Sequence, residues 1–251
     1  MELMEIYRIT VDKEYYDQLV PNINQQFVTN IYNKYYILIR KSNIKSEIRD
    51  IIHNKTKEFD FYGQIHNFNH INHSNWPELW SKKIDYIEYQ IYHFENKYPI
   101  IEQSIHYYIG MAENAISYVA RINKQEEFLT VSHIRILDKN FNNPQNIIVD
   151  YRSRDVSEYL KYRFVKKDYN YDEIENLLFN LNFDSPSFEL LYGRLVYPNF
   201  YFDLYDEIID GGIPEKGIIE VVSRAEEYED YINNIYHIIN QIKKIPKVTW
   251  L

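Results

Sequence analysis

The stretch LTVSHIRILDKN, residues 129–140, lies in the middle of the chain and differs in pattern from the sequence on either side. Apolar and polar residues alternate in LTVSHIRIL, which predicts a β-strand, and NIIVD at 146–150 predicts a second strand. We therefore expect a short β-loop insert at 128–150. The sequence before and after it has helical periodicity, so the insert interrupts a helical body.

The helical segments are defined by apolar residues that recur every three or four positions. In WPELWSKKIDYIEYQIYHF, residues 76–94, this spacing predicts one long amphipathic helix, and Asn75 and Pro77 are typical of its start. A second helix is predicted at 103–121. Beyond the insert, helices are predicted at 154–165, 172–181, 187–196 and 218–243.

The N-terminal region has a different periodicity. Residues 1–42 alternate as strands do, and in FVTNIYNKYYILIRK, residues 27–41, the segment NIYNKYY predicts a hairpin between two β-rich runs. We expect a small antiparallel sheet whose last strand ends at Arg40 or Lys41, followed by helical structure from about Ser46.

Composition limits the classes of protein to which the chain can belong. Its 251 residues are 45% hydrophobic and 26% charged, which indicates a folded chain of one large or two-lobed domain. The net charge of -9 argues against nucleic-acid binding, because phosphate neutralisation needs clustered Lys and Arg. We read the 26 Tyr as a bias of composition rather than a functional signal.

The sequence lacks Cys, a signal peptide and a long apolar run, and together these features predict a protein of the cytoplasm. No Cys is present, so disulfides and thiolate metal sites are excluded and a reducing compartment is the simplest location. The start MELMEIYRITVDKEYY lacks the apolar core of a signal peptide, and no run of about 18 apolar residues predicts membrane insertion.

Glycine placement restricts any nucleotide site. Only six Gly are present, the first is Gly63, and none of them fits GxGxxG or GxxxxGK[ST]. Loops that cradle phosphates need Gly where the backbone approaches the phosphates. A nucleotide site in this chain would have to work without such a loop.

The order of these parts predicts the fold class. We expect an α+β, two-lobed fold like that of protein kinases, with a shortened β-rich N-lobe at 1–60 and a helical C-lobe at 61–251 that contains the insert at 128–150.

Five segments, in order, resemble the YutH-like spore coat proteins, relatives of the CotS and aminoglycoside phosphotransferase families. These segments are INHSNWPELWSKKIDYIE at 71–88, HYYIGMAENAISYV at 106–119, VDYRSRDVSEYLKYRF at 149–164, ELLYGRLVYPNFYFDLYDEI at 189–208 and IPKVTWL at 245–251. The resemblance runs from about residue 60 to the C-terminus, and about sixty residues before it are few for a complete kinase N-lobe.

The resemblance implies a phosphotransferase-like fold and no established catalytic activity. It also implies association with the spore coat and with other spore coat proteins, with the protein made in the mother cell. A scaffold unrelated to spores stays open, since a fold alone does not determine function.

The stretch at 129–140 has some features of a kinase catalytic loop. His133 and Asn140 stand seven apart, as the loop His and the metal-binding Asn do in kinases, but Arg135 occupies the position of the catalytic Asp. A guanidinium stays protonated and cannot accept a proton. Asp138 stands three residues away, which displaces its carboxylate beyond what near-attack geometry tolerates, so we interpret it as a turn residue.

Asp150 ends the second predicted strand, where a metal-binding Asp of a kinase would stand. Asn140 and Asp150 are therefore weak candidates for Mg-ATP binding. Without a partner Asp or a Gly-rich loop, we expect Asp150 to cap or pair locally, and we predict no metal and no cofactor.

Asp155 opens the segment DVSEYLKYRF and is predicted to cap a helix, with Glu158 completing a capping box. In kinase-like folds the corresponding Asp also tethers the catalytic loop, so we expect Asp155 and Arg154 to brace the HIR segment. Arg135, Arg152 and Arg154 form a candidate basic cluster that either binds an acidic group or pairs with the chain's own acids.

Two further sets of residues have a structural and a functional interpretation. His66, His70 and His73 are spaced for one helical face and can bind zinc, but a polar helix end or loop is the simpler interpretation. The aromatic residues can form a docking surface, although their helical spacing favours core packing. They are Trp76, Trp80, Tyr107, Tyr108, Tyr201 and Tyr205.

The sequence therefore predicts a catalytically inactive kinase-like protein, a pseudokinase, which is not an enzyme and acts by protein binding in spore coat assembly. The alternative is an ATP-dependent phosphotransferase that uses Asp138 or Asp150 with Asn140 on a small hydroxylated substrate or a protein.

Overall fold

Three N-terminal strands pair into an antiparallel sheet in the computed structural model of the chain. The strands are β1 (Ile6–Val11), β2 (Val28–Ile31) and β3 (Lys34–Arg40), and their order in the sheet is β1-β3-β2. Ile31 pairs with Lys34, so β2 and β3 form the predicted hairpin, and β3 ends at Arg40 as predicted.

The structure describes residues 6–11, 28–31, 34–40, 74–123, 129–136 and 147–250. The predicted helical structure from Ser46 and the predicted lobe boundary at residue 60 lie outside them and stay predictions. The chain divides into two compact units, which we call the sheet unit and the helical unit. The sheet unit comprises residues 1–74, 124–169 and 179–183, and the helical unit comprises 75–123, 170–178 and 184–251.

The sheet unit also contains the predicted β-loop insert. Strands β4 (Leu129–His133) and β5 (Ile147–Tyr151) pair antiparallel, with Leu129 opposite Tyr151 and His133 opposite Ile147. Only Arg152 separates β5 from helix α5 (Ser153–Val165), which begins one residue before the predicted start. This short connection holds the end of β5 next to the first turn of α5.

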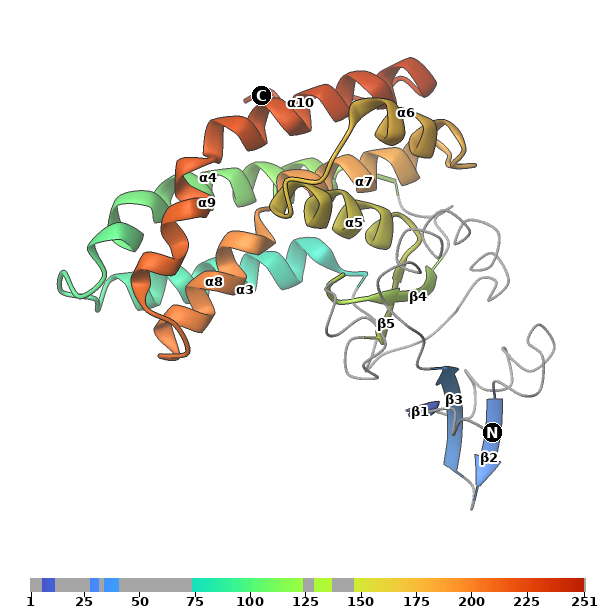
Figure 1. The fold of residues 1–251 in the computed structure, drawn as a ribbon, viewed down its shortest axis with the longest axis horizontal. Coiled ribbons are helices and arrows are strands. Elements are labelled where there is room, and N and C mark those ends of the chain that lie inside the picture. Colours follow the sequence, from blue (N-terminus) through green and yellow to red (C-terminus); the bar gives the residue numbers. More distant parts are fainter. Residues whose placement is uncertain are drawn as a thin grey trace. The chain divides into compact units, whose positions relative to one another are not determined.

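The helical unit starts with two long helices, which lie side by side in Figure 1. They are α3 (Trp76–Ile91) and α4 (Pro99–Ala120). The buried face of α3 carries Trp76, Trp80, Ile84 and Ile87, which are the residues whose spacing predicted it. The prediction for α4 was wrong at its N-terminus, because Pro99 occupies the first turn, where a missing N–H costs nothing.

The first turn of α4 is capped by a residue from far along the chain. Glu215 Oε1 accepts hydrogen bonds from the backbone N–H groups of Ile100, at 2.7 Å, and Ile101, at 3.0 Å. Its negative charge also complements the positive end of the helix dipole. Glu215 belongs to the short 3-10 helix η4 (Glu215–Ile218), which packs against α4.

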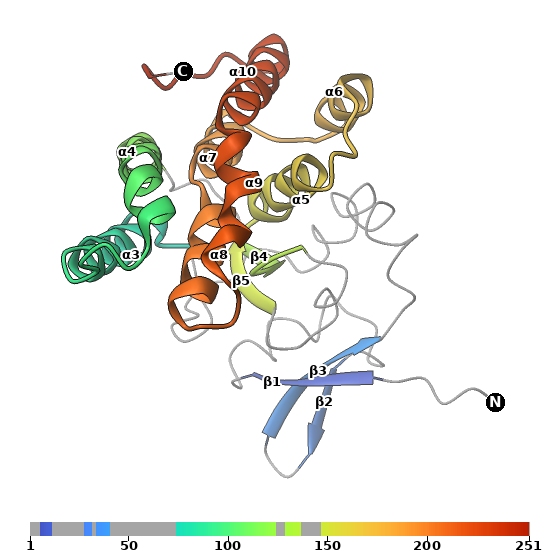
Figure 2. The ribbon, with the colours of Figure 1, turned by 60° about the vertical axis from the view of Figure 1, so that its left-hand side comes forward.

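The remaining helices are α6 (Tyr171–Phe179), α7 (Ser185–Val196), α8 (Asn199–Ile209), α9 (Ile219–Ser223) and α10 (Ala225–Ile242). Asp184 caps α7 by accepting from Ser187 N at 3.0 Å. Helix α7 packs between α4 and α10, and α10 runs beside it in Figure 2.

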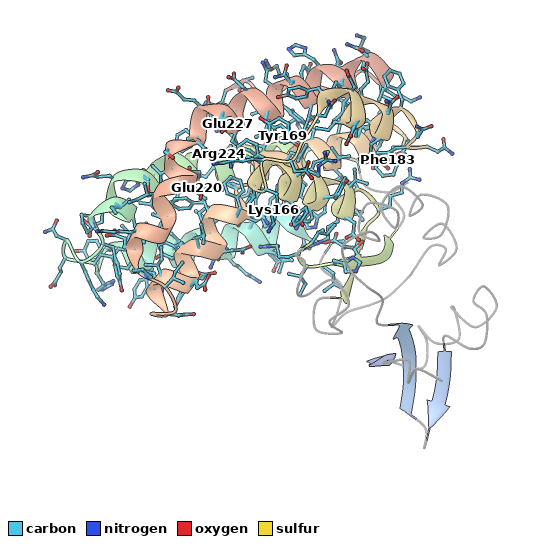
Figure 3. The ribbon with its side chains drawn as sticks, in the orientation of Figure 1. Lys166, Tyr169, Phe183, Glu220, Arg224 and Glu227 are labelled. Carbon is cyan, nitrogen blue, oxygen red and sulfur yellow. The ribbon has the colours of Figure 1, made fainter. Side chains whose placement is uncertain are left out.

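The single helix predicted at 218–243 is instead divided at Arg224, which was an error of the prediction. The backbone of Arg224 leaves the helical range, with φ -107° and ψ 17°. Its guanidinium holds Glu227, one turn into α10, through Nε at 2.6 Å and Nη2 at 2.9 Å (Figure 3). This pair stabilises the start of α10 at the point where α9 ends.

Tyrosine supplies much of the core of the helical unit. The rings of Tyr108 and Tyr201 stack with their centroids 3.7 Å apart, and both side chains are buried. Their hydroxyls are bonded, Tyr201 OH to Ser104 Oγ at 2.8 Å and Tyr108 OH to the carbonyl of Val221 at 3.2 Å. Composition alone assigned no role to the tyrosines. In the structure, some of them are large core residues whose hydroxyls are hydrogen-bonded.

Candidate functional site

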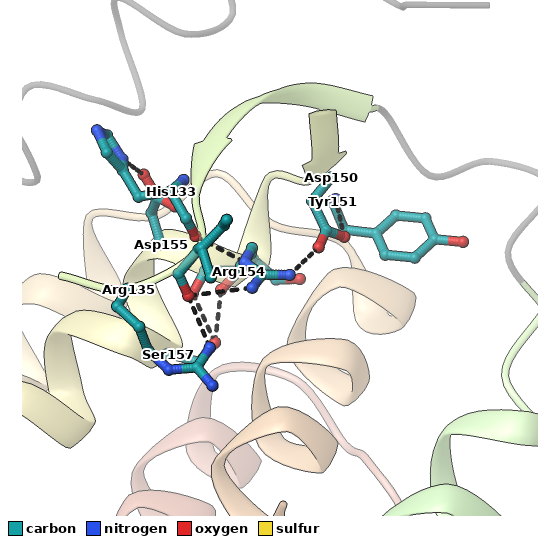
Figure 4. Close-up of polar contacts among 9 residues, drawn as sticks. His133, Arg135, Asp150, Tyr151, Arg154, Asp155 and Ser157 are labelled. Carbon is teal, nitrogen blue, oxygen red and sulfur yellow. Dashed lines mark hydrogen bonds and ion pairs between the residues drawn. The ribbon is translucent and has the colours of Figure 1, made fainter. Parts of the chain in front are cut away.

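The candidate site lies where the β4–β5 pair meets the first turn of α5, within the sheet unit (Figure 4). Five residues from the sequence predictions lie here: His133, Arg135, Asp150, Arg154 and Asp155. Asp138 and Asn140 lie in 137–146, and the His66, His70 and His73 group in 41–73, all outside the described residues.

Asp155 joins α5 to the end of β4. Its Oδ1 accepts from the backbone N–H of His133 at 2.8 Å, and its Oδ2 lies 2.6 Å from His133 Nδ1. Since the carboxylate only accepts, Nδ1 is the protonated ring nitrogen in this contact. Asp155 is fully buried and His133 is 6% exposed.

These contacts correct the predicted capping role of Asp155. Helix α5 begins at Ser153, and the side chain of Arg152, at the N-cap position, makes no capping hydrogen bond. Asp155 therefore stands inside the first turn, and its oxygens bind His133. The geometry is that of a brace on the HIR segment, while the contribution of the brace to function stays a prediction.

Arg154 connects three parts of the sheet unit. Its Nε donates to the carbonyl of His133 at 2.7 Å, its Nη2 donates to the carbonyl of Ile134 at 3.1 Å, and its Nη1 donates to Asp150 Oδ2. The guanidinium thus uses its fork of donors to fix the end of β4 against the end of β5.

Asp150 has both carboxylate oxygens engaged. Oδ2 accepts from Arg154, and Oδ1 accepts from the backbone N–H of Tyr151 at 2.7 Å. The residue is fully buried, and its ion-pair partner Arg154 is 4% exposed. A buried pair of this kind neutralises two charges that would otherwise be costly to remove from water.

The other two arginines of the candidate basic cluster make different contacts. Arg135 Nη1 donates to the carbonyl of Ile134 at 2.8 Å, within its own loop. The guanidinium of Arg152 lies over the ring of Phe183, 4.9 Å from its centroid. Arg135 and Arg154 therefore share the carbonyl of Ile134, while Arg152 packs on Phe183. Each guanidinium is held by groups of the protein itself, which favours the interpretation that the three arginines serve internal contacts.

Several buried polar groups at the site were missed by sequence reasoning. The hydroxyls of Ser132 and Ser153 are buried and make no hydrogen bond in the described part of the chain, and Lys161 of α5 is also buried. Ser and Lys carry no special spacing at these positions, so the sequence held no signal for their burial. Among the described residues, no group of three His, Asp or Glu is placed to hold a metal ion.

The sequence of the chain is similar to that of a known protein family. The sequence model of the family described as "Spore coat putative kinase YutH" matches residues 2–235. The chain belongs to this family. The predicted family resemblance is confirmed, and four of the five segments lie within the match, while IPKVTWL at 245–251 lies beyond its end. The predicted start of the resemblance near residue 60 was wrong, because the match begins at residue 2.

A curated relative in the YutH family is the endospore coat-associated protein YutH of Bacillus subtilis (strain 168). The two sequences are 25% identical over 209 residues, and the match covers 70% of this chain and 61% of the relative. The chain therefore matches about three fifths of the relative's length. No solved structure matches the chain. None of the helices in the described ranges has the length and apolar character needed to span a membrane.

Proposed function

We propose that this member of the YutH family is a pseudokinase that acts by protein binding in the assembly of the spore coat. The proposal includes a protein-kinase-like fold, no cofactor, and a location in the mother cell and the spore coat. Its partners would be other spore coat proteins. The name of the curated relative supports the coat association, and the geometry around Asp150 supports the lack of phosphoryl transfer.

The occupied carboxylate of Asp150 is the observation that carries the proposal. Mg²⁺ in phosphoryl-transfer sites is held by one or two carboxylates together with the substrate phosphates. Asp150 is fully buried, and each of its oxygens already accepts a hydrogen bond. Because Asp150 is buried, Mg²⁺ with its water and phosphate ligands could reach it only if the contact with Arg154 opened, and a buried guanidinium would then lose its counter-ion.

The position of the catalytic base supports the same conclusion. Arg135 stands where a kinase-type loop carries Asp, and its guanidinium donates to the carbonyl of Ile134 at 2.8 Å. An arginine cannot accept the proton of an attacking hydroxyl. His133 does not replace it, because its side chain is buried, with only 7% of its surface exposed.

The alternative function is an active ATP-dependent phosphotransferase. The description of the YutH family as a kinase favours it. In this alternative, Asp138 or Asp150 would serve with Asn140, and the substrate would be a small hydroxylated compound or a protein.

Thermal unfolding in the presence of Mg-ATP separates the two functions. A ligand with a Kd of about 1 mM, present at about 10 mM, would stabilise the native state by about 1.4 kcal/mol. For a chain of this size, that raises Tm by about 3–6 °C. We expect no rise with Mg-ATP beyond that seen with Mg²⁺ and sodium sulfate of equal ionic strength.

A rise of Tm that follows the Mg-ATP concentration and is lost in Asp150→Asn would overturn the proposal. So would transfer of phosphate from ATP to an acceptor, if Asp138→Asn abolished the transfer.

A further inference from the structure

The outer face of α3 carries aromatic side chains that the core does not use. Tyr86 is 55% exposed, Tyr89 is 66% exposed and Tyr92, at the C-cap, is 85% exposed. His93 lies among them, with its ring centroid 4.8 Å from that of Tyr89 and 5.3 Å from that of Tyr92. We call these four residues the α3 face. An exposed group of this kind is unusual on a soluble helix and indicates a contact surface.

Most of the exposed charges around the α3 face are negative, and the exposed Lys97, beyond Glu95, lies over the ring of Tyr98, 4.9 Å from its centroid. Asp85, Glu88 and Glu95 are exposed beside the tyrosines. The two lysines of α3 lie on earlier turns and are paired, Lys82 with Glu78 at 2.5 Å and Lys83 with Asp206. The last turn of α3 contains no basic residue, so none of its own side chains offsets the negative end of the helix dipole.

This local charge agrees with that of the whole helical unit. The unit contains 21 of the chain's 37 Asp and Glu residues but only 10 of its 28 Lys and Arg residues. The acidic excess of the protein therefore lies in this unit. A partner that approaches it is selected for positive charge, both in the encounter and in the complex.

We propose that the α3 face docks an arginine-containing basic segment of a partner protein. Exposed tyrosine rings attract a guanidinium through their faces, and Arg stacks on a ring while it donates to a carboxylate. Tyr86, Tyr89 and Tyr92 provide the rings, and Asp85, Glu88 and Glu95 provide the carboxylates. The inference rests on the proposed binding function and assigns it a surface and a partner chemistry.

Fluorescence anisotropy of a labelled peptide tests the inference on the full chain. The probe is a fluorescein-labelled peptide in which Arg alternates with Gly, and the same peptide with citrulline in place of Arg is the uncharged control. We expect the Arg peptide to bind and the citrulline peptide not to bind. The triple variant Tyr86→Ser/Tyr89→Ser/Tyr92→Ser should weaken binding about tenfold or more, because each ring is one cation–π partner.

Two control variants separate the α3 face from general attraction. Phe179→Ser removes an aromatic side chain that is 53% exposed on α6. Glu113→Gln/Asp210→Asn removes two exposed carboxylates elsewhere on the helical unit, to be compared with Asp85→Asn/Glu88→Gln. We expect both control variants to bind the Arg peptide as the wild type does. The variant Asp85→Asn/Glu88→Gln should bind it several-fold more weakly.

Three outcomes would overturn the inference. They are no binding of the Arg peptide to the wild type, equal losses in the α3 and control carboxylate pairs, and unchanged binding in the tyrosine variant. A dimer in light scattering that the tyrosine variant abolishes would also overturn it, since a second copy would then occupy the face. None of these results depends on Mg-ATP, so the thermal-unfolding test judges the proposed function separately.

Discussion

The buried pair of Asp150 and Arg154 leads to a quantitative prediction for Asp150→Asn. The substitution keeps the size of the side chain but removes the charge that balances Arg154, which is 4% exposed and hydrogen-bonded to Asp150. Breaking a buried ion pair from one side costs about 3–5 kcal/mol. We therefore expect the midpoint of thermal unfolding to fall by about 6–20 °C.

A half-exposed pair in the helical unit provides the control. Lys83 and Asp206 also form an ion pair, but their side chains are 28% and 44% exposed. Water already solvates such a pair, so Asp206→Asn should cost no more than about 1 kcal/mol. Urea unfolding followed by circular dichroism measures both variants under one set of conditions.

A double variant shows whether the cost comes from the uncompensated charge. Asp150→Asn/Arg154→Met removes both charges of the pair, so the loss of stability should be smaller than the sum of the two single losses by about 0.5–3 kcal/mol. The double variant stays less stable than the wild type, because the carbonyl of His133 loses its bond to Arg154 and that of Ile134 keeps only its bond to Arg135. The reasoning is refuted if Asp150→Asn costs no more than Asp206→Asn.

Two further predictions concern the helical unit. Glu95 has a positive φ of 49°, which is unfavourable for a side chain with a Cβ, so Glu95→Gly should stabilise the protein by about 0.5–1 kcal/mol in urea unfolding. In contrast, Glu113→Gly, at an exposed position inside α4, should destabilise it by about 1 kcal/mol; equal signs for the two variants would contradict the argument. Burial raises the pKa of Tyr192 and of Tyr201 from 10.0 to about 12. The unfolded chain therefore loses these protons first, so the contribution of the two tyrosines to stability is constant below pH 10 and falls as pH rises from 10 to 12, by roughly 1 kcal/mol per tyrosine at pH 11. Melting curves at pH 9 and 11, with tyrosinate absorbance near 295 nm, measure the loss, and equal midpoints would rule it out.

Sequence reasoning predicted elements whose signals are local. The spacing of Trp76, Trp80, Ile84 and Ile87 predicted α3, because the same four side chains form its buried face. The division between α9 and α10 was missed, since it depends on the conformation of Arg224, a residue with no helix-breaking character. Helix α8 was not predicted from periodicity, because Asn199–Ile209 is rich in aromatic residues of modest helix propensity. Its residues were noted only as part of the family-like segment at 189–208.

The contacts of the candidate site also differ in whether they could be predicted from local sequence. Asp150 and Arg154 are four residues apart, so a local pairing of Asp150 was predictable, although its partner was not named. The contact of Asp155 with His133 joins residues 22 positions apart and depends on how β4 pairs with β5. Spacing alone carries no information on such a contact, and only the resemblance to a kinase-like fold indicated it.

The distant cap on α4 has a consequence for synthesis on the ribosome. Glu215 bonds Ile100 from 115 positions further along the chain. At about 5–20 residues per second, translation needs about 6–23 s to reach Glu215 after Ile100. During that interval water must satisfy the first N–H groups of α4, and its N-terminal turn can fray. The N-terminus of α4 is therefore completed late, and a nascent chain halted before residue 215 lacks this cap.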